Sequence, residues 1–161
     1  MRKYGFWIIP ENEVYDEMQE AITKYSSKYK TPSFKPHMTI HTVVSSTDER
    51  VVKDTKKAVA KINPFKLTVG NIEFSTTFFQ CVFARINTNA NLMNAHLALR
   101  EHLKYKDKHV YMPHASLVYG DLDMETREKI CSEIKLKGKE FTANTLLLYV
   151  QIQVTPMSGM L

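Results

Sequence analysis

The chain has 161 residues, of which 43% are hydrophobic and 24% are charged, and its formal net charge is +5 at pH 7. Such a chain fits one domain, or two small lobes that share a core, and its composition excludes a disordered protein. No stretch approaches the about 18 apolar residues of a membrane-spanning helix, and the apolar run at residues 5–9 is too short for a secretory signal, so we expect a cytoplasmic protein without membrane contact.

Strand and helix patterns follow one another irregularly along the chain. Apolar residues at helical spacing, such as Val14, Met18 and Ile22, indicate a helix, and short β-branched or aromatic runs indicate strands. Ser46 with Glu49 three residues later is typical of a helix start. We predict strands at residues 3–10, 37–44, 65–74, 78–86, 114–119, 141–143 and 146–155. We predict helices at residues 12–29, 46–62, 92–103 and 123–134.

This order of elements favours an α+β fold, because strands that mix with helices without strict alternation indicate largely antiparallel sheets. We expect a single domain over residues 1–161, built as two similar lobes that each hold a sheet and a pair of helices. Cys81 and Cys131 stand in unlike contexts, with no CxxC or Cys/His cluster. Both are therefore expected to be buried thiols.

A seven-residue phrase occurs twice. Residues 34–40 read FKPHMTI and residues 111–117 read YMPHASL, so each phrase has an aromatic residue, Pro, His, a hydroxyl residue two places after His, and then an aliphatic residue. Proline lacks a backbone donor and belongs at the first residue of a strand, so each histidine becomes the first ordered side chain of its strand. A strand presents residues i and i+2 on one face, about 6 to 7 Å apart. Each phrase thus presents an imidazole and a hydroxyl together.

The pair His-x-Thr/Ser alone is a weak signal, because a chain with 6 histidines is expected to contain about one such pair by chance. The Pro and the aromatic residue shared by both copies make two structural core histidines the less favoured interpretation. We expect one strand from each lobe to line a common cleft. His37 with Thr39 and His114 with Ser116 would then surround one small anion.

Two imidazoles and two hydroxyls around one anion suit phosphodiester chemistry without a metal. Opening a cyclic phosphate requires a water deprotonated on one side and the leaving ribose oxygen protonated on the other. Imidazole, with a reference pKa near 6.5, performs either task near neutral pH. Thr39 and Ser116 would donate hydrogen bonds to the phosphate oxygens on which charge develops.

Three aromatic side chains are further candidates for the site. Trp7 and Phe79 are suited to stack on a nucleotide base, although aromatic residues in apolar runs more often fill a core. Tyr119 lies three residues beyond Ser116, so on an ideal strand it faces the other way. A role for Tyr119 in the cleft requires the strand to bend or end near it.

No metal and no cofactor is expected. His41 follows His37 by four residues, but on a strand such a pair lies about 13 Å apart, which excludes a metal site by that spacing. His96, His102 and His109 have no matching context and are expected to be surface or structural residues.

The two phrases and their neighbours resemble the 2H phosphoesterase superfamily and, within it, the cyclic phosphodiesterase-like branch. The resemblance rests on FWxxP at residues 6–10, FKPHMT at 34–39, FQCVF at 79–83 and HASLVY at 114–119, and it covers nearly the whole chain. It implies a bilobal α+β fold and metal-independent hydrolysis of nucleoside 2′,3′-cyclic phosphates or of ADP-ribose 1″,2″-cyclic phosphate. The usual product in that branch is the 2′-phosphate (the 1″-phosphate for ADP-ribose).

The resemblance places the catalytic histidines at His37 and His114, their hydroxyl partners at Thr39 and Ser116, and a downstream tyrosine at Tyr119. The sequence does not assign the acid and the base to particular histidines. Analogy favours His114 as the base and His37 as the acid.

Two other functions stay open. A 2′,5′-phosphodiesterase or RNA end-processing enzyme of the same superfamily would use the same four residues on a longer substrate, and a non-catalytic RNA- or nucleotide-binding module would keep only the cleft. Intact histidines and hydroxyls in both phrases favour an enzyme. The positive net charge favours an anionic partner, here a small cyclic-phosphate nucleotide or an RNA 3′ end. We expect the protein to be a monomer.

Overall fold

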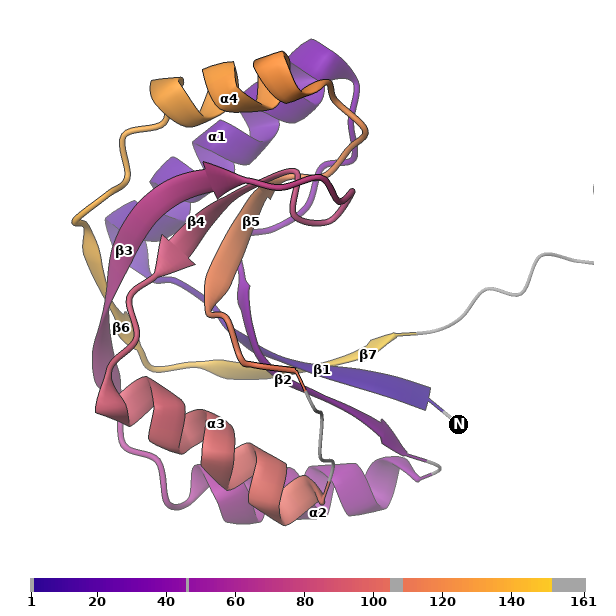
Figure 1. The fold of residues 1–161 in the computed structure, drawn as a ribbon. Coiled ribbons are helices and arrows are strands. Elements are labelled where there is room, and N and C mark those ends of the chain that lie inside the picture. The colour runs from indigo at the N-terminus through magenta and orange to yellow at the C-terminus, as the bar shows by residue number, and fades with distance from the viewer. Residues whose placement is uncertain (1, 46, 105–108, 152–161) are drawn as a thin grey trace, which may run out of the picture.

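Two antiparallel sheets face each other, and a pair of helices covers the outer side of each (Figure 1). The structure is a computed structural model, which describes residues 2–45, 47–104 and 109–151. One sheet has the strand order β2-β1-β7. Its strands are β1 (Arg2–Ile8), β2 (Met38–Ser45) and β7 (Leu146–Gln151). The other sheet has the order β5-β4-β3-β6. Its strands are β3 (Phe65–Phe74), β4 (Val82–Ile86), β5 (His114–Val118) and β6 (Glu140–Ala143).

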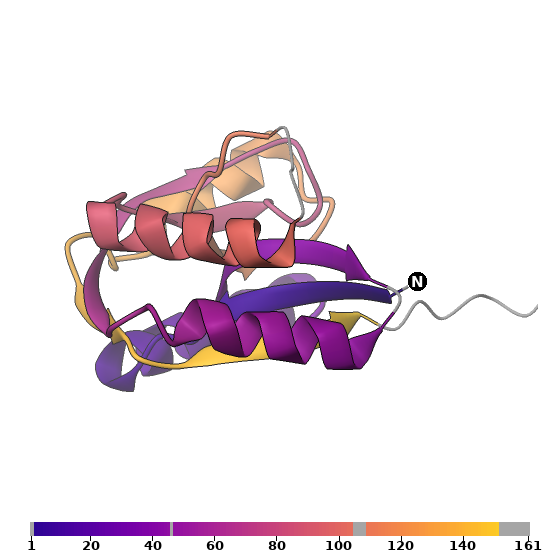
Figure 2. The same cartoon turned by 90° about the horizontal axis from the view of Figure 1, so that it is seen from below.

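The helices are exchanged between the two lobes. Helix α1 (Asn12–Tyr29) follows β1 but lies against β5 and β6 of the four-stranded sheet, while α4 (Met124–Glu133) lies against β3 and β4 of the same sheet. Helix α3 (Ala90–Leu103) follows β4 but lies against β2, beside α2 (Asp48–Val59). The pairing of α2 with α3 is seen from below in Figure 2. The α+β class and the two lobes are therefore confirmed, but neither lobe is one continuous stretch of chain.

Helix α1 has the bounds that its periodicity predicts. Val14, Met18, Ile22 and Tyr25 are buried and recur every three or four residues, so they form one face of the helix. Full burial of such a side chain contributes about 1.5–3 kcal/mol. The Tyr25 hydroxyl also donates to Glu133 of α4 at 2.8 Å, which joins the two helices of this lobe.

Alternation along β1 separates the core from the site. Tyr4, Phe6 and Ile8 are buried in the main core, whereas Gly5 and Trp7 line the space between the sheets. Successive residues of a strand point to opposite faces, so this single strand serves both purposes.

Strand β2 contains a β-bulge directly after the hydroxyl residue of the first phrase. Trp7 pairs with Thr39, and the preceding Phe6 pairs with His41, so Ile40 is an extra residue that faces no residue of β1. An extra residue reverses the alternation beyond it. His41 therefore shares the helix-facing side of Phe6 instead of the side of Thr39.

Strand β5 contains a bulge at the equivalent place. Phe83 pairs with Ser116 while Val82 pairs with Val118, so Leu117 is the extra residue. The aliphatic residue that ends each phrase is thus the bulge residue, and each is 1% exposed. The repeat therefore extends from the sequence to the backbone.

The strand predicted at residues 78–86 is too long, because only Val82–Ile86 is a strand. The preceding residues form a turn, in which the Ser75 hydroxyl donates to the carbonyl of Gln80 at 2.6 Å and the Thr77 hydroxyl accepts from the Gln80 amide at 3.2 Å. Side-chain hydrogen bonds of this kind compete with strand pairing. They decide the conformation here, although two phenylalanines in the segment favour a strand.

The ends of other helices and strands differ by a few residues from the predicted ones. Helix α2 ends at Val59 instead of residue 62, because the chain tightens there into a turn in which the Ile62 amide donates to the Val59 carbonyl at 2.9 Å. Helix α3 begins two residues early, since the Asn89 side chain caps it by accepting from the Leu92 amide at 2.8 Å. Helix α2 also begins at Asp48, with Thr47 as its N-cap, so its predicted start at residue 46 is two residues early. The end of the last predicted strand, residues 152–155, lies outside the described residues.

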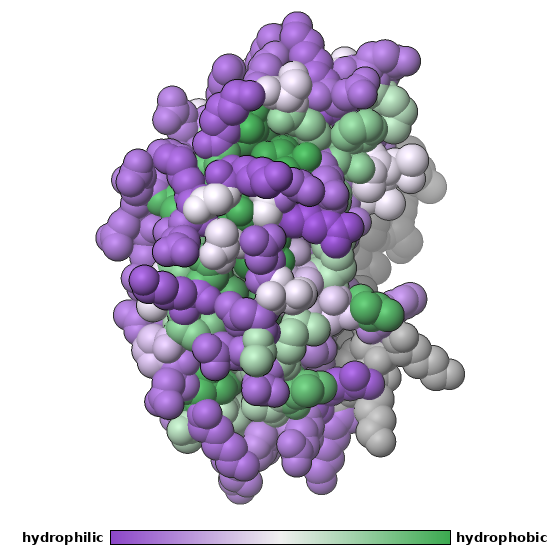
Figure 3. All heavy atoms as spheres, turned by 60° about the vertical axis from the view of Figure 1, so that its left-hand side comes forward, coloured by the Kyte–Doolittle hydropathy of each residue, from purple (hydrophilic) through white to green (hydrophobic). Residues whose placement is uncertain are grey.

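The outer face in Figure 3 is mostly hydrophilic, with apolar residues in small groups. No helix in the described part of the chain is both long and apolar enough to cross a bilayer. Cys81 is buried as expected, whereas Cys131 on α4 is only half-buried, so the prediction for Cys131 is wrong. Its side chain lies at the edge of the small core between α4 and the sheet.

Candidate active site

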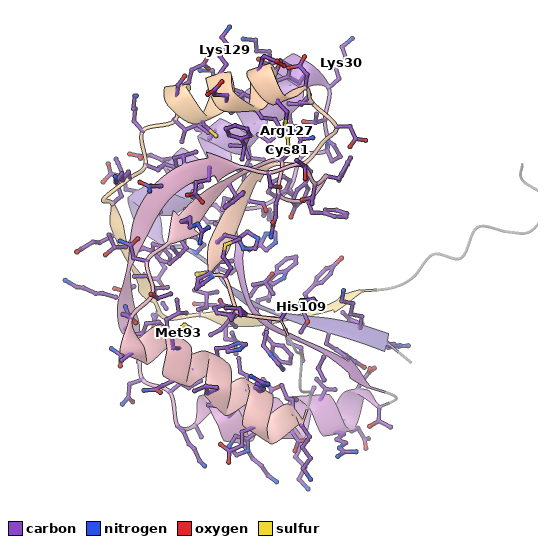
Figure 4. All side chains as sticks on the ribbon, in the orientation of Figure 1. Lys30, Cys81, Met93, His109, Arg127 and Lys129 are labelled. Atoms are coloured by element: carbon purple, nitrogen blue, oxygen red, sulfur yellow. The ribbon has the colours of Figure 1, made fainter. Side chains whose placement is uncertain are left out.

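A cleft of about 460 Å³ lies between the two sheets. This volume is within the range of pockets that hold small ligands. The structure brings all seven predicted site residues to its walls, and these are Trp7, His37, Thr39, Phe79, His114, Ser116 and Tyr119. Many side chains point from both lobes into this space (Figure 4).

The two bulges decide which residues of the motif strands reach the cleft. Thr42 and Tyr119 each lie three residues after the hydroxyl residue of their phrase, and both line the cleft. On a regular strand they would face away. Strand β5 also ends at Val118, so the condition on which a role for Tyr119 depends is met.

Both motif histidines are held in the same tautomer. Nδ1 of His37 lies 2.7 Å from the carbonyl oxygen of Lys35, and Nδ1 of His114 lies 2.9 Å from that of Met112. A carbonyl oxygen only accepts, so Nδ1 carries the proton in each neutral ring. Nε2 is then the atom of each ring that can take up or release a proton.

Burial lowers the pKa of His37 below its ordinary value, and a charge on His114 lowers it further. The carbonyl of Lys35 acts in the opposite direction but more weakly than burial. The lowered pKa favours the neutral form of His37 in the free protein.

His37 lies on an aromatic surface. The indole of Trp7 stacks on its ring with centroids 3.8 Å apart, and Tyr149 stacks on the same indole at 4.4 Å. Because β1 lies between β2 and β7, the indole lies between the imidazole and the phenol ring. A Cβ atom at Gly5 would stand 3.1 Å from the indole nitrogen, so glycine there gives the indole its space. This geometry makes Trp7 a support for His37, and base stacking by Trp7 stays a prediction.

His114 has different neighbours. The edge of the Phe83 ring faces its imidazole at 5.5 Å, and the side-chain amide nitrogen of Gln80 lies 3.4 Å from its Nε2. An amide N–H only donates, so this contact favours an unprotonated Nε2 on His114. Ser116 is 8% exposed, and its hydroxyl donates to the carbonyl of Phe79 at 2.8 Å.

The turn that contains Phe79 and Gln80 is held by a buried cation. Arg127 of α4 is 2% exposed and donates to carbonyl oxygens of this turn and of the loop after β5. The acceptors and distances are Ser75 (2.7 Å), Thr77 (2.8 Å), Gly120 (3.2 Å) and Leu122 (2.7 Å). Arg127 lies beside Cys81 under α4 (Figure 4). It fixes the turn from the side remote from the cleft.

The first aromatic residue of each phrase contacts the other lobe, either the other phrase itself or the tyrosine that follows it. Phe34 stacks on Tyr119 with centroids 3.9 Å apart, and the Tyr111 hydroxyl donates to the carbonyl of Thr39 at 2.8 Å. These contacts join the two lobes across the cleft and explain why both phrases begin with an aromatic ring. Burial raises the pKa of Tyr119, so its hydroxyl keeps its proton at neutral pH. Phe79 is 67% exposed and presents its ring edge-on to Tyr119 at 5.3 Å.

The cleft is suited to an anion. Its described lining residues include Lys3 and the two histidines but no carboxylate. Across the described residues, no group of three or more His, Cys, Asp or Glu side chains is placed to hold a metal ion. His41 lies on the other side of β2, with its ring centroid 5.6 Å from that of His96 on α3.

Seven lining residues were not predicted as site residues, and three of them, Thr42, Gln80 and Tyr149, show what sequence reasoning missed. Thr42 could have been found from the match between its position and that of Tyr119, if the bulges had been foreseen. Gln80 lies inside the quoted FQCVF stretch, yet nothing in that stretch indicates a contact with a histidine. Tyr149 comes from the last strand, and no local pattern connects it to the site.

Comparisons with known proteins identify the family and the fold of the chain. The family model "Cyclic phosphodiesterase-like protein" matches residues 1–143. A cyclic phosphodiesterase of Arabidopsis thaliana is 27% identical over 150 residues, which span 90% of this chain and 83% of that protein.

Solved structures show the same fold. Escherichia coli LigT complexed with 3′-AMP superposes with a TM-score of 0.66 at 13% identity, over 96% of this chain and 90% of LigT. LigT complexed with ATP superposes with a TM-score of 0.63 at 15% identity, over 92% and 86% of the two chains. Family match, fold and site lead to one conclusion: the chain belongs to the cyclic phosphodiesterase-like family of 2H phosphoesterases.

Proposed function

We propose that this protein hydrolyses nucleoside 2′,3′-cyclic phosphates, ADP-ribose 1″,2″-cyclic phosphate or both, and releases the 2′-type (1″-type for ADP-ribose) phosphomonoester without a metal. One observation carries the proposal. Two histidines from different sheets, each with Nδ1 bound to a carbonyl oxygen, present Nε2 in one cleft whose described lining residues include no carboxylate. The Arabidopsis relative and the 3′-AMP complex of LigT support a nucleotide substrate.

The reaction needs one proton acceptor and one proton donor. Nε2 of one histidine takes a proton from water as the water oxygen bonds to phosphorus. Nε2 of the other gives a proton to the leaving ribose oxygen as its bond to phosphorus breaks. The hydroxyl of Thr39 donates to a phosphate oxygen, and that of Ser116 does so after turning away from the Phe79 carbonyl.

The contacts of the two rings support His114 as the base and His37 as the acid. The Gln80 amide beside Nε2 of His114 favours a lone pair on that atom, as a base requires. The indole under His37 favours a positive charge on the ring, because an aromatic face attracts cations. Burial lowers the pKa of His37 in the free protein and so opposes a positive charge on the ring. The negative charge of a bound cyclic phosphate raises this pKa and offsets the effect of burial.

The exposed aromatic ring of Phe79 is the proposed platform for the base or adenine ring. It is 67% exposed, lies at the wall of the cleft, and is fixed through its turn by Arg127. Stacking of a base on such a ring is worth about 1–3 kcal/mol.

An assay with four candidate substrates in EDTA tests the proposal. Purified protein would be offered adenosine and uridine 2′,3′-cyclic phosphates, ADP-ribose 1″,2″-cyclic phosphate and 2′,5′-oligoadenylate, with His37→Ala and His114→Ala as controls. We expect hydrolysis of at least one cyclic phosphate, with loss of at least a hundredfold in each variant. Cleavage of the oligoadenylate alone would establish the 2′,5′-phosphodiesterase instead, and activity that survives either substitution would refute the mechanism.

A further inference from the structure

An aromatic side chain of β7, that of Tyr149, lies at the wall of the active-site cleft. Every second residue of this strand packs against the main core, namely Leu146, Leu148 and Val150. Successive residues of a strand point to opposite faces, so the ring of Tyr149 is on the cleft side. It is 44% exposed. Filling of the core therefore does not explain an aromatic ring at this position.

We propose that Tyr149 is a positioning residue of the active site: its ring holds the indole of Trp7 in place, and the indole in turn fixes the ring of His37. The inference rests on the proposed function, because it assigns Tyr149 to the proton-donating step of that reaction. Strand β7 lies beyond residues 1–143, which the family model matches, so membership of the family assigns no role to this residue.

The three rings form one continuous stack. The imidazole of His37 and the indole of Trp7 have centroids 3.8 Å apart and planes tilted by 23°. The indole and the phenol ring of Tyr149 have centroids 4.4 Å apart and planes tilted by 12°. The stack runs across the sheet in the order β2-β1-β7, which Figure 1 shows, with His37 directly before β2. The indole therefore has a ring on each of its faces, and each contact stabilises its orientation.

The register of the sheet explains how the indole reaches Tyr149. Tyr149 pairs with Gly5, whereas Trp7 pairs with Leu147, so the two aromatic residues are diagonal neighbours. Diagonal neighbours on adjacent strands are within reach of aromatic side chains. Because Gly5 has no side chain, the indole lies over its backbone and extends towards β7. The two aromatic residues and the glycine thus form one local arrangement.

A single hydrogen bond does not fix an imidazole ring. Nδ1 of His37 lies 2.7 Å from the carbonyl oxygen of Lys35, which holds one atom and still permits the ring plane to turn. The flat indole restrains the plane and so gives Nε2 one direction. In the proposed reaction, Nε2 gives its proton to the leaving ribose oxygen, and this transfer depends on that direction. An indole with water on its outer face would restrain the ring less.

Two substrates that differ in the leaving atom test the proposal. One is adenosine 2′,3′-cyclic phosphate, and the other has sulfur in place of the 3′ oxygen that leaves. A thiolate leaves without a proton, whereas the ribose oxygen requires the acid. For Tyr149→Ala we expect kcat on the oxygen substrate to fall about five- to tenfold, with little change in KM. We expect kcat on the sulfur substrate to stay at the native value.

Two further variants are controls. Tyr149→Phe keeps the ring and should match the native protein on both substrates. Leu147→Ala is the matched control for a weakened β7, because Leu147 points to the same face, is 45% exposed, and is not among the residues that line the cleft. It should leave kcat unchanged on both substrates.

The kinetic result decides the proposal. Equal falls of kcat on the two substrates would overturn it, because Tyr149 would then act on binding or folding and not on the acid. Native kcat in Tyr149→Ala would overturn it as well. So would a Tyr149→Phe variant that is impaired as much as Tyr149→Ala, since the hydroxyl would then be the active group.

NMR titration of His37 in the free protein gives a second readout that needs no turnover. The pKa of His37 should rise towards its ordinary value in Tyr149→Ala, because the stack opens and burial decreases, and should stay unchanged in Tyr149→Phe and Leu147→Ala. If neither substrate is hydrolysed, the proposed function has failed. If the sulfur substrate does not restore activity to His37→Ala, His37 is not the acid. In both cases the titration alone decides, and an unchanged pKa in Tyr149→Ala would overturn the role of Tyr149.

Discussion

The two halves of the site have the same phrase but different surroundings. His37 lies flat on an indole, whereas His114 faces the edge of a phenyl ring and the amide of Gln80. The phrases fix the backbone, the tautomer and the bulge in both halves. Residues outside the phrases then make the two imidazoles unequal, as the proposed division into one acid and one base requires.

The largest expected effect separates the roles of the two histidines. His37→Ala and His114→Ala should each lower kcat/KM on a cyclic phosphate by about 10²–10⁴-fold. A substrate with a sulfur leaving group needs no protonation, so it should restore activity to His37→Ala and not to His114→Ala. Parallel kinetics on oxygen and sulfur substrates would check this, and restoration in His114→Ala alone would reverse the assignment.

The two hydroxyls should also differ. Thr39→Val removes a donor to the phosphate and should lower kcat about a hundredfold, or about 3 kcal/mol, with little change in KM. Ser116→Ala should lower kcat by less and raise KM, because the Ser116 hydroxyl also holds the Phe79 carbonyl. Steady-state kinetics on both variants would measure the difference, and identical changes in kcat and KM would contradict it.

Substitution of Arg127 should change the structure around His114 and leave that around His37 unchanged. Arg127→Met removes the buried side chain that donates to four carbonyl oxygens of two loops, which should lower the free energy of unfolding by about 2 kcal/mol or more. Denaturant unfolding would measure this loss. In the folded variant, the NMR signals of Gln80 and His114 should shift while those of His37 stay in place. Shifts at His37 of equal size would show that the halves are not independent.

The smallest effect concerns the pKa of His37 in the free protein. Burial is the main cause of its lowered pKa, so Trp7→Ala should expose the ring and raise the pKa towards the ordinary value. His114→Ala should raise it as well, but by less, because the charge of His114 is a weaker cause. NMR titration of the imidazole protons would measure both shifts, and a further fall in Trp7→Ala would show that stacking outweighs burial.

The same lowered pKa sets the pH dependence. If His37 must be protonated as the acid, kcat/KM should decline as the pH rises through the lowered pKa of the free protein. The bound phosphate raises that pKa, so the alkaline decline of kcat should lie at higher pH than that of kcat/KM. If kcat and kcat/KM declined at the same pH, bound substrate would have no effect on the pKa of His37.

Local patterns predicted the elements and the site, but not how elements exchange between lobes. Helix α1 is predicted with its observed bounds because one face is regularly apolar. The phrases predict His37, Thr39, His114 and Ser116 at one cleft because Pro, His and hydroxyl positions depend on one strand only. Tyr119 faces the cleft because of the bulge at Leu117, and a bulge leaves no periodic pattern in the sequence that would predict it.

The contact of Gln80 with His114 also lies beyond local pattern. It depends on a turn that side-chain hydrogen bonds and Arg127 stabilise, and these partners come from distant parts of the chain. The exchange of α1 and α3 between lobes is likewise decided by packing of whole surfaces. No short stretch of the sequence indicates these contacts.

The position of β1 has a consequence for synthesis of the protein. β1 is the central strand of its sheet, and one of its two neighbours is β7; of the described strands, β1 is made first and β7 last. Domains generally fold as units when enough chain has emerged. Both histidine strands thus leave the ribosome before the sheet around His37 can close, so a nascent chain has both histidine phrases but an incomplete cleft until β7 pairs with β1.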